Sequence, residues 1–413
     1  MEGRLMKQNL TFIHAADLHL DSPFRGLANI PEHIFSDVLK STFQALDNLV
    51  NVAIEREVDF ILLAGDLFDN ERKSLKAQIH LRNAFEKLNH YNINVYLSYG
   101  NHDFINGNVH QLEYPKNVYC FPDENVRHVI HKKNDDDIAA IYGFSYENQA
   151  IKSNKTSDYV VSQKNIPYHI AILHGNLTGQ TDHDTYAPFQ LRDLTEKEFD
   201  YWALGHIHQR NILSENPPVI YPGNTQGRHR KELGEKGCYH VTLSETDNEL
   251  SFIPLQSIIF VALNINIDER KSITQLERIL KTEMEKQLTN SPQLVHLTIQ
   301  KSLGENSLSK NDTHFYHDLI DIINETFMNQ KNWLYIYRYT VSNKKAENYQ
   351  ELFDGDYFIS ELTSKLIDSP IDPYLNDLYQ HRQARKHLDV LSDQDQEMIR
   401  KEAYDLLLGK LLD

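Results

Sequence analysis

Five short apolar runs in this sequence end in side chains that commonly bind metal ions. One run, at residues 59–64, stops at Gly65 and Asp66. A short apolar run bounded by turn residues is typical of a strand buried on both faces, and ligands of open α/β sheets gather at the carboxyl ends of such strands. We therefore expect the side chains that follow the runs to meet at one rim and to form a metal site. They are Asp17 and His19, Asp66, Asn101 and His102, His174, and His206 and His208.

The ligand types in this set restrict the metal. Mixed oxygen and imidazole ligands suit manganese, iron or zinc and argue against calcium, while the absence of thiolate argues against a structural zinc site. Each short motif is common by itself, but five independent strands that end in metal-ligand types are specific. We expect His14 to be a satisfied histidine in the core or on a face of the sheet, and Asp69 and Asp103 to lie in turns or to support the ligands.

The elements between the runs predict an α/β layer fold. Residues 35–56 and 74–88 carry apolar side chains at helical spacing and alternate with strands, which is typical of a βαβαβ arrangement. From residue 117 the pattern changes to short strands that recur up to residue 253, with a polar turn at residues 135–137. Together they indicate two sheets packed face to face with helices outside.

The remainder of the chain predicts two further regions after a boundary near residues 254–257. Residues 261–341 show a second βαβαβ pattern, which predicts a small capping domain of α+β type. A polar linker and two apolar helical stripes follow. We expect a first domain at residues 1–255, a capping domain at 256–342 and a helical region at 343–413.

Composition limits the classes of function. The chain has 413 residues, 40% of them hydrophobic, so a mainly disordered protein is excluded. A formal net charge of −17 repels nucleic acid over most of the surface, so any contact with a polyanion must be local. Cys120 and Cys238 are the only cysteines, and the chain shows neither a signal segment nor an apolar run long enough to span a membrane. We expect a cytoplasmic protein that does not bind membranes.

A basic cluster at residues 228–231 is the most cationic short segment of this acidic chain. Arg228, His229 and Arg230 either contact backbone phosphates or form a solvated turn paired with neighbouring glutamates. Arg25 is a weaker candidate of the same kind. Residues 186–189 either line the cleft or pack a loop.

The ordered motifs resemble those of the calcineurin-like metallophosphoesterase family, a two-sheet sandwich with αββα layers. Within that family, residues 16–20, 65–69 and 221–224 resemble the SbcD-type DNA repair exonucleases, and most closely their YhaO branch. The resemblance extends over residues 11–255 and rests only on the order of elements beyond them. Asp21 departs from the small residue found in many SbcD-type nucleases, which affects the expected substrate contacts of the first loop.

The resemblance implies two divalent metal ions that share Asp66. Asp17, His19 and His208 would complete one site, and Asn101, His174 and His206 the other. Manganese is the expected ion, with iron and zinc as alternatives. His102 would lie beside the ions without binding them, and an imidazole in that position suits a general acid near neutral pH.

The implied activity is 3′ to 5′ exonuclease cleavage of DNA, with some endonuclease activity. The implied partners are an SMC-like ABC ATPase of the SbcC or YhaN type and a second copy of the chain, bound through helices that include residues 74–88. Two alternatives remain: a phosphodiesterase or phosphatase for small nucleotides, and a weakly active module that positions an ATPase. The terminal stripe of Ile399, Ala403, Leu407 and Leu411 either docks the ATPase or packs on its own domain.

Overall fold

A computed structural model describes most of the chain, and its contacts divide the chain into two compact units. The first unit comprises residues 1–262, 287–296 and 324–337, and the second comprises residues 263–286, 297–323 and 338–413. The described residues are 8–24, 26–27, 29–69, 74–107, 112–178, 186–268, 272–302 and 312–343, together with Gln396, Ile399, Arg400 and Ala403. Arg25 and most of the predicted C-terminal helical region, including Leu407 and Leu411, lie outside them.

The first unit contains two six-stranded mixed sheets. In the first sheet, with strand order β12-β11-β1-β2-β3-β4, the strands β1 to β4 are parallel and β11 is antiparallel to both of its neighbours. Its strands are β1 (Leu10–Ala15), β2 (Phe60–Ala64), β3 (Asn94–Ser98), β4 (Val118–Cys120), β11 (Gly237–Leu243) and β12 (Asn248–Pro254).

In the second sheet, with strand order β5-β6-β7-β8-β10-β9, the four central strands are parallel and the two edge strands are antiparallel to their neighbours. Its strands are β5 (Arg127–Lys133), β6 (Asp136–Gly143), β7 (Tyr168–His174), β8 (Tyr201–Gly205), β9 (Asn211–Glu215) and β10 (Pro218–Tyr221). The predicted face-to-face pair of sheets is confirmed.

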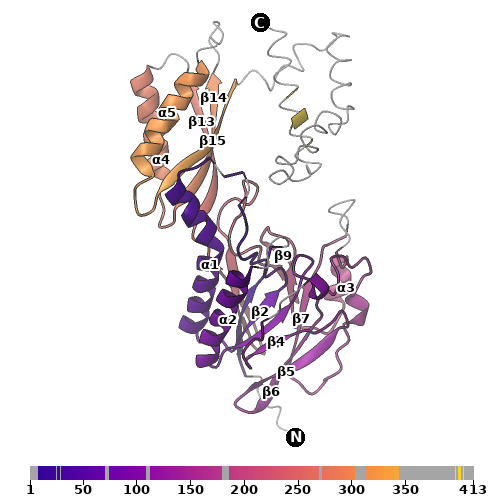
Figure 1. The fold of residues 1–413 in the computed structure, drawn as a ribbon. Helices are drawn as coiled ribbons and strands as arrows, with labels where there is room; N and C mark the ends of the chain where they lie inside the picture. The colour runs from indigo at the N-terminus through magenta and orange to yellow at the C-terminus, as the bar shows by residue number, and fades with distance from the viewer. Residues whose placement is uncertain are drawn as a thin grey trace, which may run out of the picture. The chain divides into compact units, whose positions relative to one another are not determined.

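The residue pattern explains how the layers pack. Along β2, Ile61 and Leu63 pack with α1 (Glu32–Glu55) and α2 (Leu75–His90), while Phe60 and Leu62 point into the core between the sheets. The two helices lie side by side on one face of the first sheet (Figure 1). The outer face of the second sheet is covered by the short helix α3 (Leu191–Thr195) and by loops. A strand that is apolar on both faces can only be stable between two such layers.

A satellite core joins the start of α1 to later parts of the same unit. Ile34 and Val38 of α1 pack with a small set of buried side chains, and the indole N–H of Trp333 donates to Asp37 Oδ2 at 3.1 Å. The other buried apolar members of this cluster are Phe24, Leu27, Ile258, Phe260, Leu294 and Trp333. The first unit therefore extends beyond residue 255 and includes segments from later in the chain.

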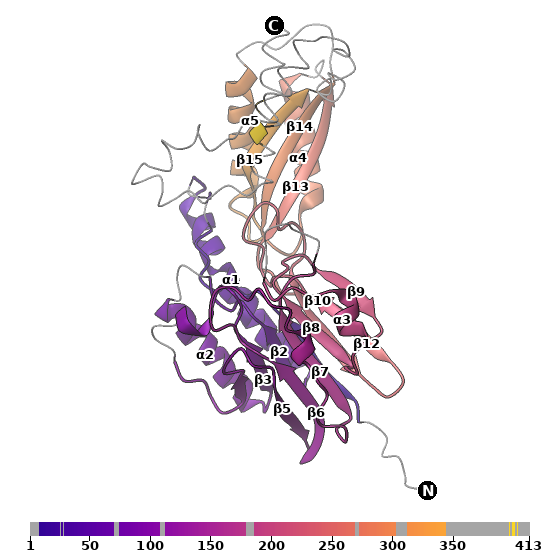
Figure 2. The same ribbon diagram turned by 90° about the vertical axis from the view of Figure 1, so that its right-hand side faces the viewer.

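The later part of the chain has the predicted βαβαβ order. A three-stranded sheet in the order β13-β14-β15 carries two helices on one face (Figures 1 and 2). Its elements are β13 (Ile259–Asp268), α4 (Ile273–Gln287), β14 (Gln293–Ser302), α5 (Asp312–Phe327) and β15 (Leu334–Asn343). Among the described residues, no helix is both long and apolar enough to cross a membrane.

Three local details differ from the sequence-based expectation. The turn between β5 and β6 is shorter than predicted: only Asn134 and Asp135 form it, both with positive φ, and Asp136 already begins β6. Two-residue hairpin turns with positive φ favour Asn and Asp, which explains this shorter turn. The elements β9 and α3 were not predicted, because each is only 5 residues long and lacks a clear apolar period.

Candidate metal centre

Sharp turns at the ends of the strands bring the predicted ligands together. Asp17, His19, Asp66 and His206 all have positive φ values, of 53°, 42°, 50° and 102°. Such a conformation is costly for residues other than glycine and is concentrated at functional sites. The turns after β1 and β2 also bind each other, because the Asp17 N–H donates to the Gly65 carbonyl at 3.1 Å and the His19 N–H to the Asp66 carbonyl at 3.0 Å.

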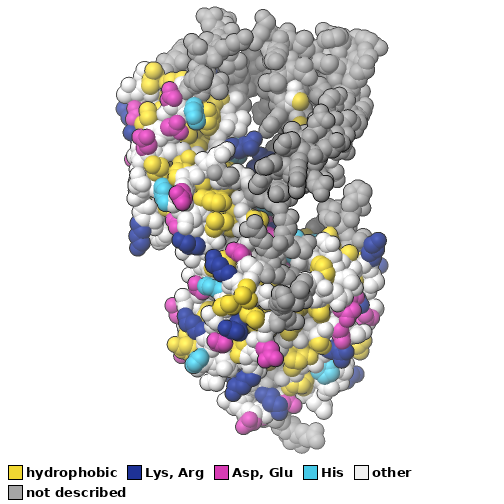
Figure 3. All heavy atoms as spheres, in the orientation of Figure 1, with side chains coloured by type: hydrophobic (Ala, Val, Ile, Leu, Met, Phe, Trp, Pro, Cys, Tyr) yellow, Lys and Arg dark blue, Asp and Glu magenta, His cyan; other side chains and the backbone are white. Residues whose placement is uncertain are grey.

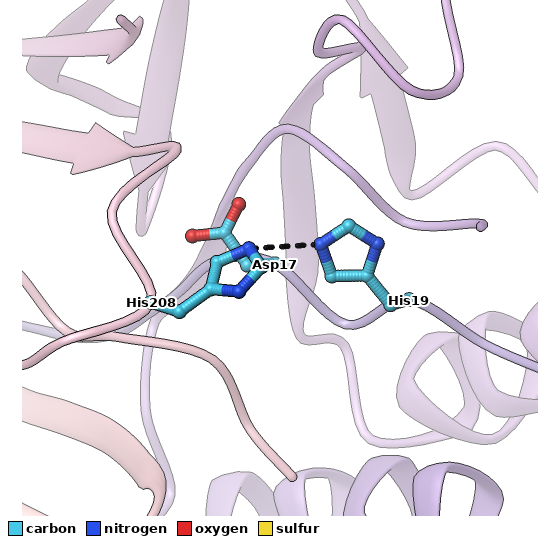
Figure 4. Close-up of side chains that lie close together, drawn as sticks. All are labelled: Asp17, His19 and His208. Atoms are coloured by element: carbon cyan, nitrogen blue, oxygen red, sulfur yellow. Dashed lines mark hydrogen bonds between the residues drawn. The ribbon is translucent and has the colours of Figure 1, made fainter. Parts of the chain in front are cut away.

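Asp17, His19 and His208 form the first group of possible ligands, and Figure 4 shows their side chains converging. One ligand atom from each residue lies within 4.8 Å of the others. The Nε2 atoms of His19 and His208 face each other at 3.1 Å. Both carboxylate oxygens of Asp17 accept the backbone N–H of His206 at 3.1 Å, which fixes the carboxylate beside the second group.

Asp66, His174 and His206 form the second group, again with ligand atoms within 4.8 Å of one another. His174 Nε2 lies 3.5 Å from Asp66 Oδ2, while its Nδ1 lies 2.9 Å from the carbonyl oxygen of Ala64 at the end of β2. Asn101 Oδ1 lies 2.9 Å from His174 Nε2 and 3.1 Å from His206 Nδ1. Asn101 thus lies with the group to which the family resemblance assigns it.

Asp66 lies between the two groups. Its Oδ2 atom is 3.5 Å from His174 Nε2 and 3.8 Å from His19 Nε2, so one carboxylate oxygen approaches a histidine of each group. All seven predicted ligands therefore converge on one place, with Asp66 in the position expected of a shared ligand.

Two glycines permit the close approach of the strand ends. A Cβ atom on Gly205 would collide with the carbonyl oxygen of Ala64 and lie 2.9 Å from His174 Nδ1. Gly65 has φ 83°, and a Cβ atom there would also collide with the imidazole of His174. Glycine at both positions lets β2 and β8 pack around His174 without a side chain between them.

Charges in the buried site are strongly coupled. Burial alone would lower the pKa of His174, but the carboxylates of Asp66 and Asp17 raise it to about 9. Burial would raise the pKa of Asp66, yet the charge and hydrogen bond of His174 hold it well below its usual range. Burial raises the pKa of Asp17 to about 6 and lowers that of His206 to about 3, so at neutral pH His206 offers a lone pair.

The donor set fits two divalent cations. Each group combines one carboxylate with two imidazoles, and a mixed set of this kind suits manganese, iron or zinc. Two imidazole nitrogens that face each other at 3.1 Å, beside buried carboxylates, are the arrangement expected around a cation. Divalent ions bound there would neutralise the two buried carboxylates and polarise a phosphoryl group.

His102 lies next to both groups but belongs to neither. Its backbone N–H donates to Asp66 Oδ1 at 2.9 Å, and its ring meets the ring of His19 edge to face at a centroid distance of 5.1 Å. Its Nδ1 atom is buried and has no hydrogen-bond partner in the described structure. Burial lowers the pKa of His102, although the nearby carboxylates of Asp66 and Asp69 act in the opposite direction.

Asp103 and Asp69 support the site, as the sequence indicated. The carboxylate of Asp103 accepts the backbone N–H groups of Leu67 and Gly100, both at 2.6 Å, and so ties the turns after β2 and β3 together. Asp69 Oδ2 accepts from Ser22 Oγ at 3.1 Å and from Arg228 Nη1 at 2.9 Å. These carboxylates therefore orient loops around the ligand groups.

The basic cluster is partly paired with acidic side chains. Arg228 is largely buried and bonds Asp69, and its guanidinium also lies 3.9 Å from Glu232 Oε1. His229 Nε2 lies 3.3 Å from the same Glu232 oxygen. Burial would raise the pKa of Glu232, but its hydrogen bond to His208 and the nearby charges hold it well below its usual range. Glu232 also contacts His208 directly, a role that no sequence motif indicated.

The positions of His14 and of residues 186–189 bear on two more sequence-based expectations. His14 is a core residue, as expected, with Nδ1 3.0 Å from the Tyr201 hydroxyl and Nε2 3.1 Å from the Leu204 carbonyl. Residues 186–189 divide between the two proposed roles: Phe189 is fully buried in the core, whereas the Tyr186 ring packs on His206 at a centroid distance of 5.0 Å.

Comparison with known proteins identifies the family to which the chain belongs. Residues 10–210 match the model of the calcineurin-like phosphoesterases. The chain is 37% identical over 408 residues to the uncharacterized metallophosphoesterase YhaO of Bacillus subtilis, a match that covers 98% of this chain and 99% of YhaO. It is 27% identical over 282 residues to the DNA double-strand break repair protein Mre11 of Methanocaldococcus jannaschii, covering 64% of this chain and 72% of that protein.

A second Mre11, from Thermoplasma acidophilum, is 27% identical over 236 residues, with 52% of this chain and 60% of that protein covered. The matched family model and the match to YhaO, which extends over nearly the full length of both chains, both cover the two ligand groups found at the strand ends. The chain therefore belongs to the calcineurin-like phosphoesterase family, a family of hydrolases that act on phosphoester bonds.

Proposed function

We propose that this protein is a metal-dependent DNA nuclease that cleaves phosphodiester bonds from 3′ to 5′, with some endonuclease activity. The main support for metal-dependent hydrolysis is the pair of ligand groups that meet at Asp66. The DNA part is supported by the similarity to two proteins named for DNA double-strand break repair. The similarity to one of them extends over 72% of its length.

The seven ligands would hold two divalent ions, for which manganese is our first choice. Such ions lower the pKa of water and stabilise charge on the phosphoryl oxygens of a transferring group. The protein residues supply the geometry: Asp17, His19 and His208 on one side, Asn101, His174 and His206 on the other, and Asp66 between them. Only two carboxylates contribute charge, so the loaded centre keeps a net positive charge to meet an anionic phosphodiester.

His102 is the proposed general acid. It touches Asp66 through its backbone and places an unbonded, buried Nδ1 atom beside the centre. Burial lowers its pKa, but a bound phosphodiester would act in the opposite direction because a nearby negative charge favours imidazolium. Proton donation to the leaving sugar oxygen is the role expected of such a group.

Contact with DNA must be local. The net charge is −17, and in Figure 3 acidic and basic side chains are interspersed on the visible face. We propose that Arg25, Arg228, His229 and Arg230 contact backbone phosphates, with the smallest contribution from Arg228 because it already bonds Asp69. Replacing Arg230 by alanine should weaken DNA binding and lower the salt slope by about 1. An unchanged slope would remove Arg230 from the interface.

The same net charge favours a second candidate function, because a small anionic substrate needs no extended basic surface. A phosphodiesterase or phosphatase for small nucleotides would use the same centre. The test is hydrolysis of 3′-labelled linear duplex DNA and of an aryl phosphodiester, both with manganese, by the unaltered protein and by His102→Ala. DNA hydrolysis from the 3′ end supports the nuclease, whereas turnover of the small ester alone supports the second candidate.

We also propose an SMC-like ABC ATPase and a second copy of this chain as partners in the cytoplasm. Leu75 and Ile79 of α2 are exposed, with 59% and 37% of their surface accessible, and would lie in the dimer contact. The terminal stripe would dock the ATPase. Removing residues 345–413 should abolish ATPase binding in a pull-down with the purified ATPase, and intact binding would refute the docking role.

A further inference from the structure

The loop between β10 and β11, residues 222–236, folds back onto His208. Gly223 has φ 78°, and a Cβ atom there would lie 2.8 Å from the His208 carbonyl oxygen and 3.0 Å from the Arg210 nitrogen. The same carbonyl accepts the Lys236 ammonium at 3.0 Å, at the far end of the loop. Both ends of this loop therefore hold the backbone of one predicted metal ligand.

The middle of the loop reaches the His208 side chain through Glu232. This glutamate is only 5% exposed, and its Oε1 atom lies 2.6 Å from His208 Nδ1. Its Oε2 atom accepts the Arg228 backbone N–H at 2.6 Å and the Asn224 side-chain amide at 2.9 Å. A carboxylate that accepts two hydrogen bonds on one oxygen and lies beside Arg228 and His229 is ionised and can only accept on the other, so the hydrogen at the short contact belongs to His208 Nδ1. Arg228 Nη2 lies 3.4 Å from the same nitrogen, a longer contact than the 2.6 Å bond to the carboxylate.

The consequence concerns the other nitrogen of the ring. In a neutral imidazole only one nitrogen carries hydrogen, so an Nδ1–H leaves a lone pair on Nε2. His208 Nε2 is the atom that faces His19 Nε2 at 3.1 Å, within the first ligand group. We propose that Glu232 is a positioning residue that fixes the His208 tautomer and ring orientation for cation binding. This inference rests on the proposed metal centre and extends it to a residue outside the ligand set.

A purely structural role for Glu232 is the competing explanation, and the loop offers a control for it. Gln226 also fastens this loop, since its amide donates to the Ile258 carbonyl at 2.8 Å and its oxygen accepts the Ser257 N–H at 2.9 Å. None of the hydrogen bonds of Gln226 in the described structure goes to Glu232 or His208. Gln226→Ala should therefore lower stability and leave cation binding at the first group nearly unchanged.

Glu232→Gln is the decisive variant because it keeps the side-chain shape. The oxygen of the new amide is expected to remain with the Arg228 N–H, which turns the amide nitrogen toward His208 Nδ1. That nitrogen donates, so Nδ1 must accept and the hydrogen moves to Nε2. Glu232→Asp keeps the charge but withdraws the carboxylate by one methylene, which separates loss of charge from loss of the hydrogen bond. Glu235→Gln removes a charge from an exposed position in the same loop.

The first readout needs no metal and no substrate. Ring-nitrogen chemical shifts in ¹⁵N-histidine-labelled protein report the tautomer, and His208→Gln identifies the His208 signals by their loss. We expect the Nδ1–H form in the unaltered protein, in Gln226→Ala and in Glu235→Gln, and the Nε2–H form in Glu232→Gln. An unchanged Nδ1–H form in folded Glu232→Gln would overturn the inference.

The second readout is calorimetric titration with Mn²⁺ alone. Glu232→Gln should lower the affinity for one of the two ions by roughly 10- to 100-fold and leave the affinity for the other nearly unchanged. Glu232→Asp should also bind that ion more weakly than the unaltered protein does. Equal affinities in Glu232→Gln and the unaltered protein would contradict the inference, as would an Asp variant that binds like the unaltered protein. If the protein binds two ions but cleaves no DNA, only the proposed nuclease function fails.

Discussion

The two ligand groups are oriented by different means. In the second group, His174 Nδ1 bonds the main-chain carbonyl of Ala64, at the end of a strand buried in the sheet. In the first group, His208 Nδ1 bonds the side chain of Glu232, on a loop between two strands. A main-chain acceptor is set by the fold and cannot be removed by substitution, whereas a side-chain acceptor can. The two sites should therefore differ in how a mutation can weaken them.

This difference in orientation also predicts which residues of each group are sensitive to substitution. Orientation through the backbone depends on close packing of strand ends, so the vulnerable residues of the second group are glycines such as Gly205. Orientation through a side chain depends on a hydrogen-bond network, so the vulnerable residue of the first group is Glu232, at the centre of that network. Substitutions of the two kinds should have separable effects on stability and on cation binding.

Asp66→Asn should affect cation binding at both ligand groups at once, so it should not distinguish between them. Asp66 Oδ2 approaches His19 and His174, so loss of its charge should lower the affinity for both ions. Phosphoester hydrolysis should fall by about 10³-fold or more, because several kcal/mol of transition-state stabilisation depend on the ions. Rates with an aryl phosphodiester and metal analysis of the purified variant would check this. Two ions retained at full affinity would rule out a shared ligand.

Gly205→Ala tests the backbone-oriented group. The added methyl would collide with the Ala64 carbonyl and approach His174 Nδ1, so β2 and β8 must separate. Overpacking of this kind costs about 3 kcal/mol, which corresponds to a fall of about 6–12 °C in the melting temperature. Calorimetric melting in EDTA measures the loss. A melting temperature within a degree of the unaltered protein would mean that the strand ends tolerate separation.

His14→Gln sharpens the distinction between site histidines and core histidines. Burial lowers the pKa of His14 to about 3, so the folded state stays neutral while the unfolded state takes up a proton below pH 6.5. Stability is therefore lost as the pH falls from about 6.5 toward 3. Between pH 7 and pH 5 this histidine alone should cost about 2 kcal/mol.

The variant should lose this part of the acid sensitivity, measured by urea unfolding in EDTA at both pH values. Binding of Mn²⁺ should stay unchanged, because both ring nitrogens of His14 contact Tyr201 and Leu204 and not the ligand groups. Equal acid sensitivity in the two proteins would contradict the assignment of His14 as a neutral core residue.

Gly234→Ala gives the smallest expected effect and is the loop counterpart of Gly205→Ala. Gly234 has φ 75°, but a Cβ atom there would have nothing within 4 Å. The cost is then only that of a left-handed conformation, about 1 kcal/mol, or a fall of about 2–4 °C in the melting temperature. A loss as large as that of Gly205→Ala would show that the loop is as tightly packed as the strand ends.

Most of the fold, and the strand ends at which the seven candidate ligands lie, were predictable from the sequence. Each ligand follows an apolar run, and the runs are long enough to identify as buried strands. The assignment of Asp66 to both groups came from family resemblance, because spacing along the chain does not specify which strand ends become neighbours. Their neighbourhood follows from the strand order, which local patterns do not encode.

The environment of the ligands was less predictable. For Arg228 the sequence left two alternatives, a phosphate contact or a solvated turn paired with glutamates. Neither included its partner Asp69, which lies 159 positions away, because such a pair leaves no local signal. The second of these alternatives placed Glu232 in a solvated turn, because a buried and an exposed glutamate look alike in a polar loop. Burial and tertiary hydrogen bonds determine the partners that these two residues have in the structure.

The most direct test of the two-group centre is a crystal structure of the protein soaked with Mn²⁺, with anomalous scattering used to locate the ions. We predict two adjacent peaks, one among Asp17, His19 and His208 and the other among Asn101, His174 and His206, with Asp66 touching both. A single peak, or two peaks that share no ligand, would contradict the account.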